Sequence, residues 1–125
     1  MELADIKPVE RIIDILHPAT DEKLGISVTI LSINDEKMNA VKRRIQNKRM
    51  ELERRGKAFN ASDLKDNELE LLLTSIVCWD WGNNEFHGEV PEFNEKNVKA
   101  VLTELPWFKQ QIMDAVGDEK SFFQS

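Results

Sequence analysis

The stretch that decides the fold spans residues 64–123, LKDNELELLLTSIVCWDWGNNEFHGEVPEFNEKNVKAVLTELPWFKQQIMDAVGDEKSFF. It holds all three tryptophans and five of the six phenylalanines of the chain. A small domain places such side chains in its core, because they bury the most apolar surface per residue. We therefore expect Trp79, Trp81 and Trp107 to be core residues, in preference to exposed anchors for a partner.

Apolar side chains recur at helical spacing in the first part of this stretch. The i, i+3, i+4, i+7 pattern from Leu69 to Ile76 predicts a central core helix from about residue 64 to residue 79 or 81. Ser62 and Asp63 are the candidate N-caps of this helix.

Two shorter helices are expected to follow. Asn94 is a suitable N-cap for a helix over about residues 95–104. Pro106 fits the first position of a last helix, and Gly117 is expected to end it.

The N-terminal part reads as a β-hairpin. Residues 9–16 are rich in β-branched side chains, and residues 26–33 begin with apolar and polar side chains in alternation. Turn-forming residues fill the segment between these runs. Because an isolated hairpin is only marginally stable, it must either pack on the helices or pair with a strand of another subunit.

Between the hairpin and the central helix, residues 36–56 predict a long helix. Asn34 or Asp35 is its expected N-cap and Gly56 its expected C-cap. Its apolar positions form a narrow stripe, close to a coiled-coil seam, which we expect to be exposed. The residues of this stripe are Met38, Val41, Ile45, Leu52 and Phe59.

Together these elements predict an α+β fold that is mostly helical, with an N-terminal hairpin followed by about four helices. The length of 125 residues indicates a single domain, in which residues 1–8 and 118–125 are expected to be flexible tails. Phe122 and Phe123 in the second tail either fold back onto the domain or reach a partner.

The net charge of −6 conceals an uneven distribution. Residues 35–57 carry nine basic and four acidic side chains, a net charge of +5, whereas the rest of the chain carries −11. Two interpretations stay open: a charge match within the chain or between subunits, or a basic arm for an acidic partner.

No residue pattern predicts catalysis or a cofactor. His17 and His87 lie in turns without a metal-binding motif, and Asp80 has no marked catalytic partner. Cys78 is expected to be a small buried apolar residue. We therefore expect no enzyme activity, no metal and no cofactor. The chain begins without a signal peptide pattern and has no apolar run of about 20 residues, so a cytoplasmic location is expected.

Several segments, taken in order and with their spacing, resemble the tail assembly chaperone family of long-tailed bacteriophages. The segments are HPAT (17–20), LG (24–25), VCW (77–79), GEVPEFNEKNV (88–98), WFKQQI (107–112) and GDEKSFF (117–123). The resemblance spans about residues 10–123.

The resemblance implies a non-catalytic role. Proteins of this family coat the tape measure protein in the host cytoplasm before the tail tube polymerises around it, and they are absent from the finished virion. Many are made in a short form and a longer, frameshifted form, and the extension binds the tail tube subunit. This chain would be the short form or its N-terminal domain. Self-association is a further property that the resemblance implies.

The exposed stripe and the C-terminal phenylalanines are the expected partner-binding surfaces. The residues concerned are Met38, Val41, Ile45, Leu52, Phe122 and Phe123. An alternative from a different class is a small nucleic-acid-binding regulator that uses the basic helix over residues 37–57. The acidic composition of the chain and the lack of a nucleic-acid motif make this the second choice.

Overall fold

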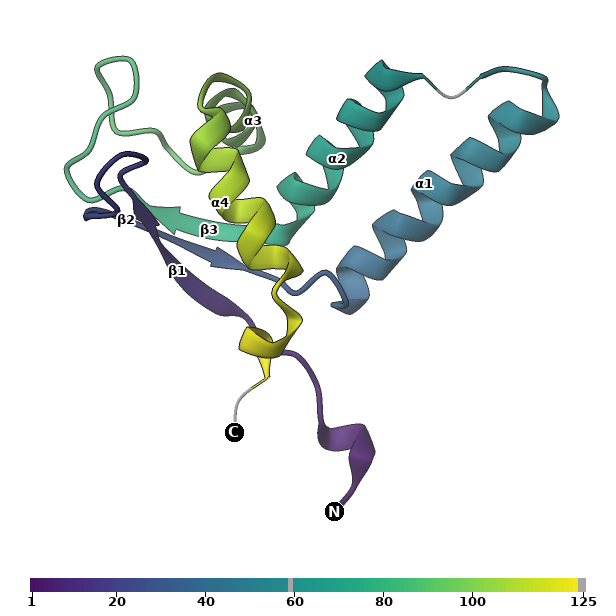
Figure 1. Ribbon diagram of the computed structural model, residues 1–125, viewed down its shortest axis with the longest axis horizontal. Helices are drawn as coiled ribbons and strands as arrows, with labels where there is room; N and C mark the ends of the chain where they lie inside the picture. Colours follow the sequence, from purple (N-terminus) through teal and green to yellow (C-terminus); the bar gives the residue numbers. More distant parts are fainter. Residues whose placement is uncertain (59, 124–125) are drawn as a thin grey trace.

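The computed structural model describes residues 1–58 and 60–123, and within them it contains a three-stranded sheet and four α-helices (Figure 1). The elements in chain order are the 3₁₀ helix η1 (Leu3–Asp5), β1 (Arg11–Leu16), β2 (Lys23–Ile30), α1 (Glu36–Arg54), α2 (Ala61–Ser75), β3 (Ile76–Asp80), α3 (Glu95–Glu104), α4 (Pro106–Gly117) and the 3₁₀ helix η2 (Glu119–Phe122). The predicted α+β, mostly helical fold is confirmed.

The predicted hairpin forms two neighbouring strands of the sheet. β1 and β2 pair antiparallel with Arg11 opposite Ile30 and Ile15 opposite Ile26. The backbone N–H of His17 donates to the carbonyl of Glu22 at 2.8 Å, which closes the loop between them. β2 is the central strand, and its other edge pairs antiparallel with β3. The hairpin is therefore completed within the chain by a third strand.

The third strand corrects the expectation that the central helix runs to residue 79 or 81. α2 ends at Ser75, whose hydroxyl donates to the carbonyl of Leu72 at 2.7 Å. The next two residues, Ile76 and Val77, are β-branched and favour a strand. The backbone carbonyl of Ser75 accepts a 2.8 Å hydrogen bond from Leu31, so the chain joins the sheet directly after the helix. Sheet pairing therefore overrides the helical spacing of the side chains.

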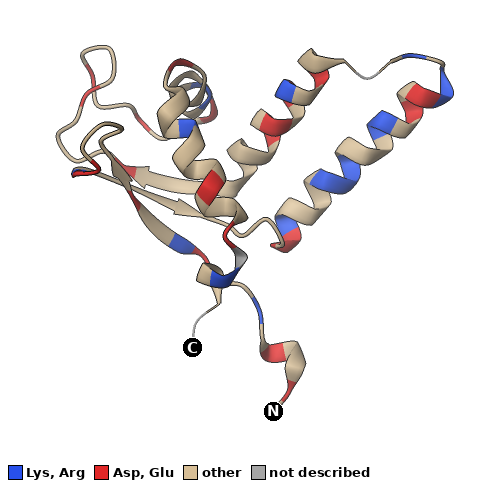
Figure 2. Ribbon diagram, in the orientation of Figure 1, with Lys and Arg blue, Asp and Glu red and all other residues tan. Residues whose placement is uncertain are grey.

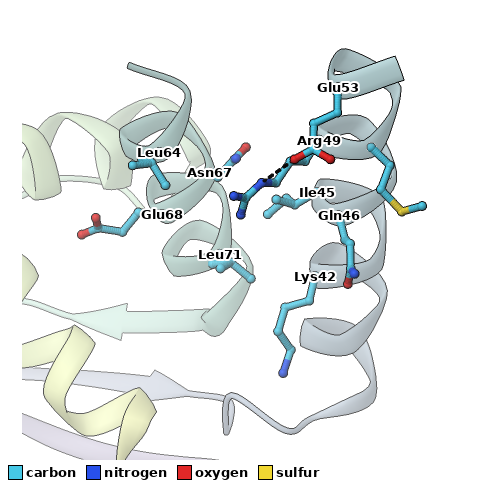
Figure 3. Close-up of a pocket in the computed structure, with 10 residues that line it drawn as sticks. Lys42, Ile45, Gln46, Arg49, Glu53, Leu64, Asn67, Glu68 and Leu71 are labelled. Atoms are coloured by element: carbon cyan, nitrogen blue, oxygen red, sulfur yellow. Dashed lines mark ion pairs between the residues drawn. The ribbon is translucent and has the colours of Figure 1, made fainter. Parts of the chain in front are cut away.

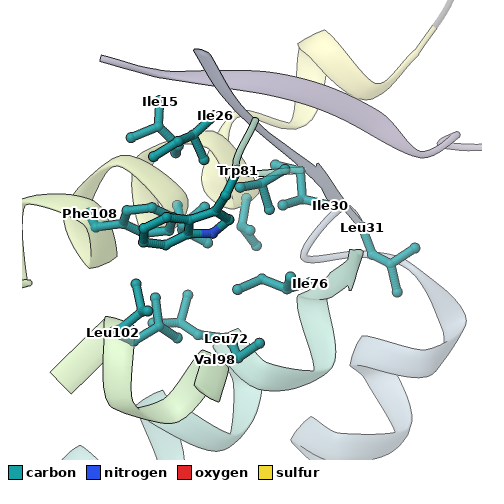
Figure 4. Close-up of a cluster of buried hydrophobic side chains, with 14 of the residues drawn as sticks. Ile15, Ile26, Ile30, Leu31, Leu72, Ile76, Trp81, Val98, Leu102 and Phe108 are labelled. Carbon is teal, nitrogen blue, oxygen red and sulfur yellow. The ribbon is translucent and has the colours of Figure 1, made fainter. Parts of the chain in front are cut away.

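One face of the sheet carries the core. α3, α4 and the end of α2 nearest the sheet lie over this face (Figure 1). Figure 4 shows Trp81 among the buried side chains of the strands and helices, stacked on Phe108 with ring centroids 5.8 Å apart. Trp81 is the buried tryptophan of the set, whereas Trp79 and Trp107 are half-buried at the edge of this core. The expected core role is thus met most fully by Trp81.

The other face of the sheet is not covered by any helix of the described chain (Figure 1). Ile12 on β1 is 70% exposed there, and Cys78 on β3 is also exposed. Both residues lie opposite Thr29 of the central strand, so the three share this face. The expectation of a buried Cys78 was wrong, because the residue belongs to a strand and its side chain points away from the core.

Most helix boundaries match the residues that the sequence offers as caps. The carboxylate of Asp35 accepts a hydrogen bond from the backbone N–H of Lys37. The side-chain oxygen of Asn94 accepts one from the backbone N–H of Asn97. Pro106 occupies the start of α4 as predicted. The N-cap of α2 is Asn60, and Asp63 completes a capping box with it, so neither expected residue is the cap.

Candidate partner-binding groove on the α1–α2 arm

α1 and α2 form an antiparallel pair that extends away from the sheet (Figure 1). In α1 only Met38 and Val41, in the first two turns, are buried. We call the described residues between 42 and 71 the arm; at its base, Leu69 and Leu71 of α2 still pack against the core. The arm is joined at its far end by a short connection, and short connections favour antiparallel neighbouring helices.

A groove with a volume of about 700 Å³ lies along the arm between its two helices. Figure 3 shows Ile45 projecting from α1 toward α2, where Leu71 lies on the facing helix. Met50 and Leu64 also line the groove and are 58% and 56% exposed. The remaining lining residues are Lys42, Gln46, Arg49, Glu53, Asn67 and Glu68. The groove therefore offers an accessible apolar floor with a polar rim.

The charged side chains on the rim differ in how they are paired. Arg49 and Glu53 of α1 form an ion pair with a separation of 3.6 Å between Nε and Oε1. Glu68 of α2 pairs with Lys109 of α4, with Nζ and Oε1 3.0 Å apart, and this contact ties the arm to the body. Lys42 has no ion-pair partner among the described residues. Both carboxylates on the rim are thus matched by cations of the chain itself.

Part of the positive charge of α1 is compensated within the arm. Figure 2 marks the positions of basic residues along the ribbon of α1 and of acidic residues along the facing α2. Arg44 pairs with Glu70 of α2, and Arg55 pairs with Glu51 at 3.1 Å between Nε and Oε1. Exposed pairs of this kind contribute about 0–1 kcal/mol each to the free energy of unfolding. The charge asymmetry therefore has a component that is matched within the chain.

The structure separates the predicted partner-binding residues of α1 into two groups. Met38 is fully buried and Val41 nearly so, which corrects the expectation of one exposed stripe, because the first turns of α1 pack on the core. Ile45 is half-buried and lines the groove. Leu52 is half-buried against the start of α2, close to Asp63. Phe59, the last residue of the expected stripe, lies outside the described residues.

The two C-terminal phenylalanines also have different environments. Phe122 is fully buried in the core, and its backbone carbonyl accepts a 2.9 Å hydrogen bond from Val9. Of the two alternatives for this residue, the structure shows the fold back onto the domain, so Phe122 offers no exposed surface. Phe123 is 42% exposed. Residues 124 and 125 lie outside the described residues.

The sequence pattern does not predict the α2 side of the groove. It places Leu64 and Leu71 on a core helix, and Met50 lies outside the predicted stripe of α1. A signal is nevertheless present: two helices joined by a short segment are expected to pack side by side, so exposed apolar residues on both would face a common groove. The core stripe of α2 masked this signal.

The other candidate residues have local structural roles. The Nδ1 atom of His17 accepts from the backbone N–H of Ala19 at 3.1 Å, and His87 lies 3.0 Å from a carboxylate oxygen of Glu104. The carboxylate of Asp80 accepts a 2.8 Å hydrogen bond from the backbone N–H of Gly82 in the turn that follows. Within residues 1–58 and 60–123, no three His, Cys, Asp or Glu side chains are grouped so as to hold a metal ion. No described helix has the length and apolar character to cross a membrane.

Comparisons with models of protein families, with curated proteins and with solved structures gave no match.

Proposed function

We propose that this chain is a tail assembly chaperone of a long-tailed bacteriophage, which binds helical segments of the tape measure protein without catalysis. The observation that carries the proposal is the groove on the arm, which presents apolar side chains of two helices to solvent. In this proposal the protein acts in the host cytoplasm and is absent from the mature virion. A longer form with a frameshifted extension would also bind the tail tube subunit.

The dimensions of the groove support a helical partner. From Lys42 to Glu53 it follows about three turns of α1, roughly 16 Å at 1.5 Å per residue. An amphipathic helix laid along these turns would bury its apolar side chains against Ile45, Met50 and Leu71, in the manner of other helix-in-groove complexes. Methionine in such a surface adapts to side chains of different shape, which suits a chaperone that meets a long and varied helical protein.

The direct test is co-expression with the tape measure protein of the same phage. We expect the native chain to raise the fraction of tape measure protein that remains in solution after centrifugation. Leu64→Asp should remove much of this effect, because it places a carboxylate in the apolar groove. Ile12→Asp is the matched control, since Ile12 is also exposed but lies on the open face of the sheet. If the native chain leaves the tape measure protein as insoluble as when it is made alone, the proposed function is wrong.

The second candidate, a nucleic-acid-binding regulator, is favoured by one observation. Arg43 and Lys48 of α1 are exposed and have no ion-pair partner among the described residues. Phosphate binding through such side chains would weaken steeply as salt rises, because counterions are released on binding. Fluorescence anisotropy with a labelled DNA duplex at low salt measures this. Binding that is lost in Arg43→Glu would favour the regulator over the chaperone.

A further inference from the structure

The rim of the groove carries two cations and two carboxylates, but they are not paired with one another one to one. Glu53 and Glu68, its two carboxylates, are each paired with a cation. Lys42, by contrast, lies at the end of the groove nearer the body and has no carboxylate partner among the described residues. Lys42 is also partly withdrawn from solvent, so a carboxylate brought to it would be less screened than at a fully exposed position.

We propose that the groove selects amphipathic helices that carry Asp or Glu beside their apolar stripe, with one carboxylate placed against Lys42. This inference rests on the proposed function and names the class of helix that the groove accepts. A helix with lysine at that place would bring like charges together beside Lys42 and Arg49, which disfavours binding. The apolar floor contributes affinity for either helix, and the charged rim determines which of the two helices binds more tightly.

The spacing of the rim cations extends the recognition pattern. Lys42 and Arg49 are seven residues apart on α1, so they lie on the same face, about two turns or roughly 10 Å apart along the axis. Carboxylates seven residues apart on an aligned partner helix would reach both cations.

Two synthetic peptides of about 20 residues provide the test, since that length allows a stable amphipathic helix. Both peptides have the same stripe of leucines. Beside this stripe, two positions seven residues apart hold glutamate in one peptide and lysine in the other. Fluorescence anisotropy at low and physiological salt measures their dissociation constants with the native chain, with Lys42→Glu and with Lys57→Glu. Lys57 lies just after α1 and outside the groove, so Lys57→Glu makes the same change of charge at a position that does not line the groove.

We expect the native chain to bind the glutamate peptide about three to ten times more tightly than the lysine peptide, as one or two partly exposed charge pairs predict. Lys42→Glu should reverse or abolish this preference, and Lys57→Glu should keep it. A milder variant, Lys42→Gln, should bind both peptides about equally.

Three results would overturn the inference. Equal binding of both peptides by the native chain shows that the groove does not distinguish the charge of its partner. The proposed chaperone function is then tested by the co-expression experiment alone. A preference that survives Lys42→Glu assigns the selection to another surface. Absence of binding to both peptides, together with a positive co-expression result, shows that the arm groove is not where helices bind.

Discussion

Gln111 on α4 forms two hydrogen bonds with the backbone of Leu16 at the end of β1. Its side-chain oxygen accepts from the Leu16 N–H, and its side-chain nitrogen donates to the Leu16 carbonyl, both at 2.8 Å. The register of β1 against β2 shifts between Ile15 and Leu16, so the ladder is irregular at this point. The amide of Gln111 thus provides the backbone partners at the point where the ladder is disrupted, and it fixes α4 to the sheet.

Gln111→Ala should therefore lower the free energy of unfolding by about 1–3 kcal/mol, because two partly buried backbone groups lose their partners. Urea denaturation measures the change. Gln110→Ala is the matched control: Gln110 is exposed, and among the described residues its side chain bonds to Asp114 on the same helix, so its loss should cost about 0.5 kcal/mol or less. Equal costs for the two variants would contradict the role assigned to Gln111.

The C-terminal phenylalanines give a second matched pair. Phe122→Ala should lower the free energy of unfolding by about 3–5 kcal/mol, because it leaves a cavity in the core. Phe123→Ala should change it by less than about 1 kcal/mol, since this side chain is 42% exposed. If Phe122→Ala is as mild as Phe123→Ala in thermal or urea unfolding, the end of the chain does not pack as the structure shows.

The methionines of α1 test the division between the buried base of the helix and the arm. Met38 is fully enclosed, so Met38→Ala should cost about 2–5 kcal/mol of unfolding free energy. Met50→Ala should cost about 0.5 kcal/mol or less, because Met50 is exposed on the groove. The same two variants, assayed in co-expression, should separate stability from binding. Loss of chaperone effect in Met50→Ala at unchanged stability is the expected result.

The exposed thiol of Cys78 gives a chemical test of the third strand. A thiol-specific reagent such as an aromatic disulfide should react with the folded protein, at one thiol per chain and at a rate close to that in denaturant. A thiol that reacts only after unfolding would contradict the placement of Cys78 on the open face of the sheet.

The sequence predicted those elements whose signals are local. Alternation in residues 26–30 predicted β2. The capping residues Asp35 and Asn94 predicted the starts of α1 and α3, and Pro106, suited to the first helical position, predicted the start of α4. The signal for β3 was not local. The residues around Ile76 fit a helical pattern as well as a strand, and only pairing with β2, which lies about fifty residues earlier in the chain, selects the strand.

The candidate site was predicted in part for a similar reason. The apolar stripe of α1 was visible in the sequence, but which of its residues are covered depends on where the core ends. Met38 and Val41 pack on the core, whereas Ile45 lies past it and meets α2. The partner side of the groove, Leu71 above all, is specified by the packing of two helices and not by the periodicity of either one.

Hydrogen–deuterium exchange on the complex formed by co-expression with the tape measure protein tests the central claim most directly. Exchange reports which backbone amides become protected when the partner binds. We predict that protection rises in α1 from about residue 42 to residue 53 and in α2 from about residue 61 to residue 71, on the two sides of the groove. Protection that rises instead in β1 and β3, with the arm unchanged, would contradict the claim that the α1–α2 groove binds the partner.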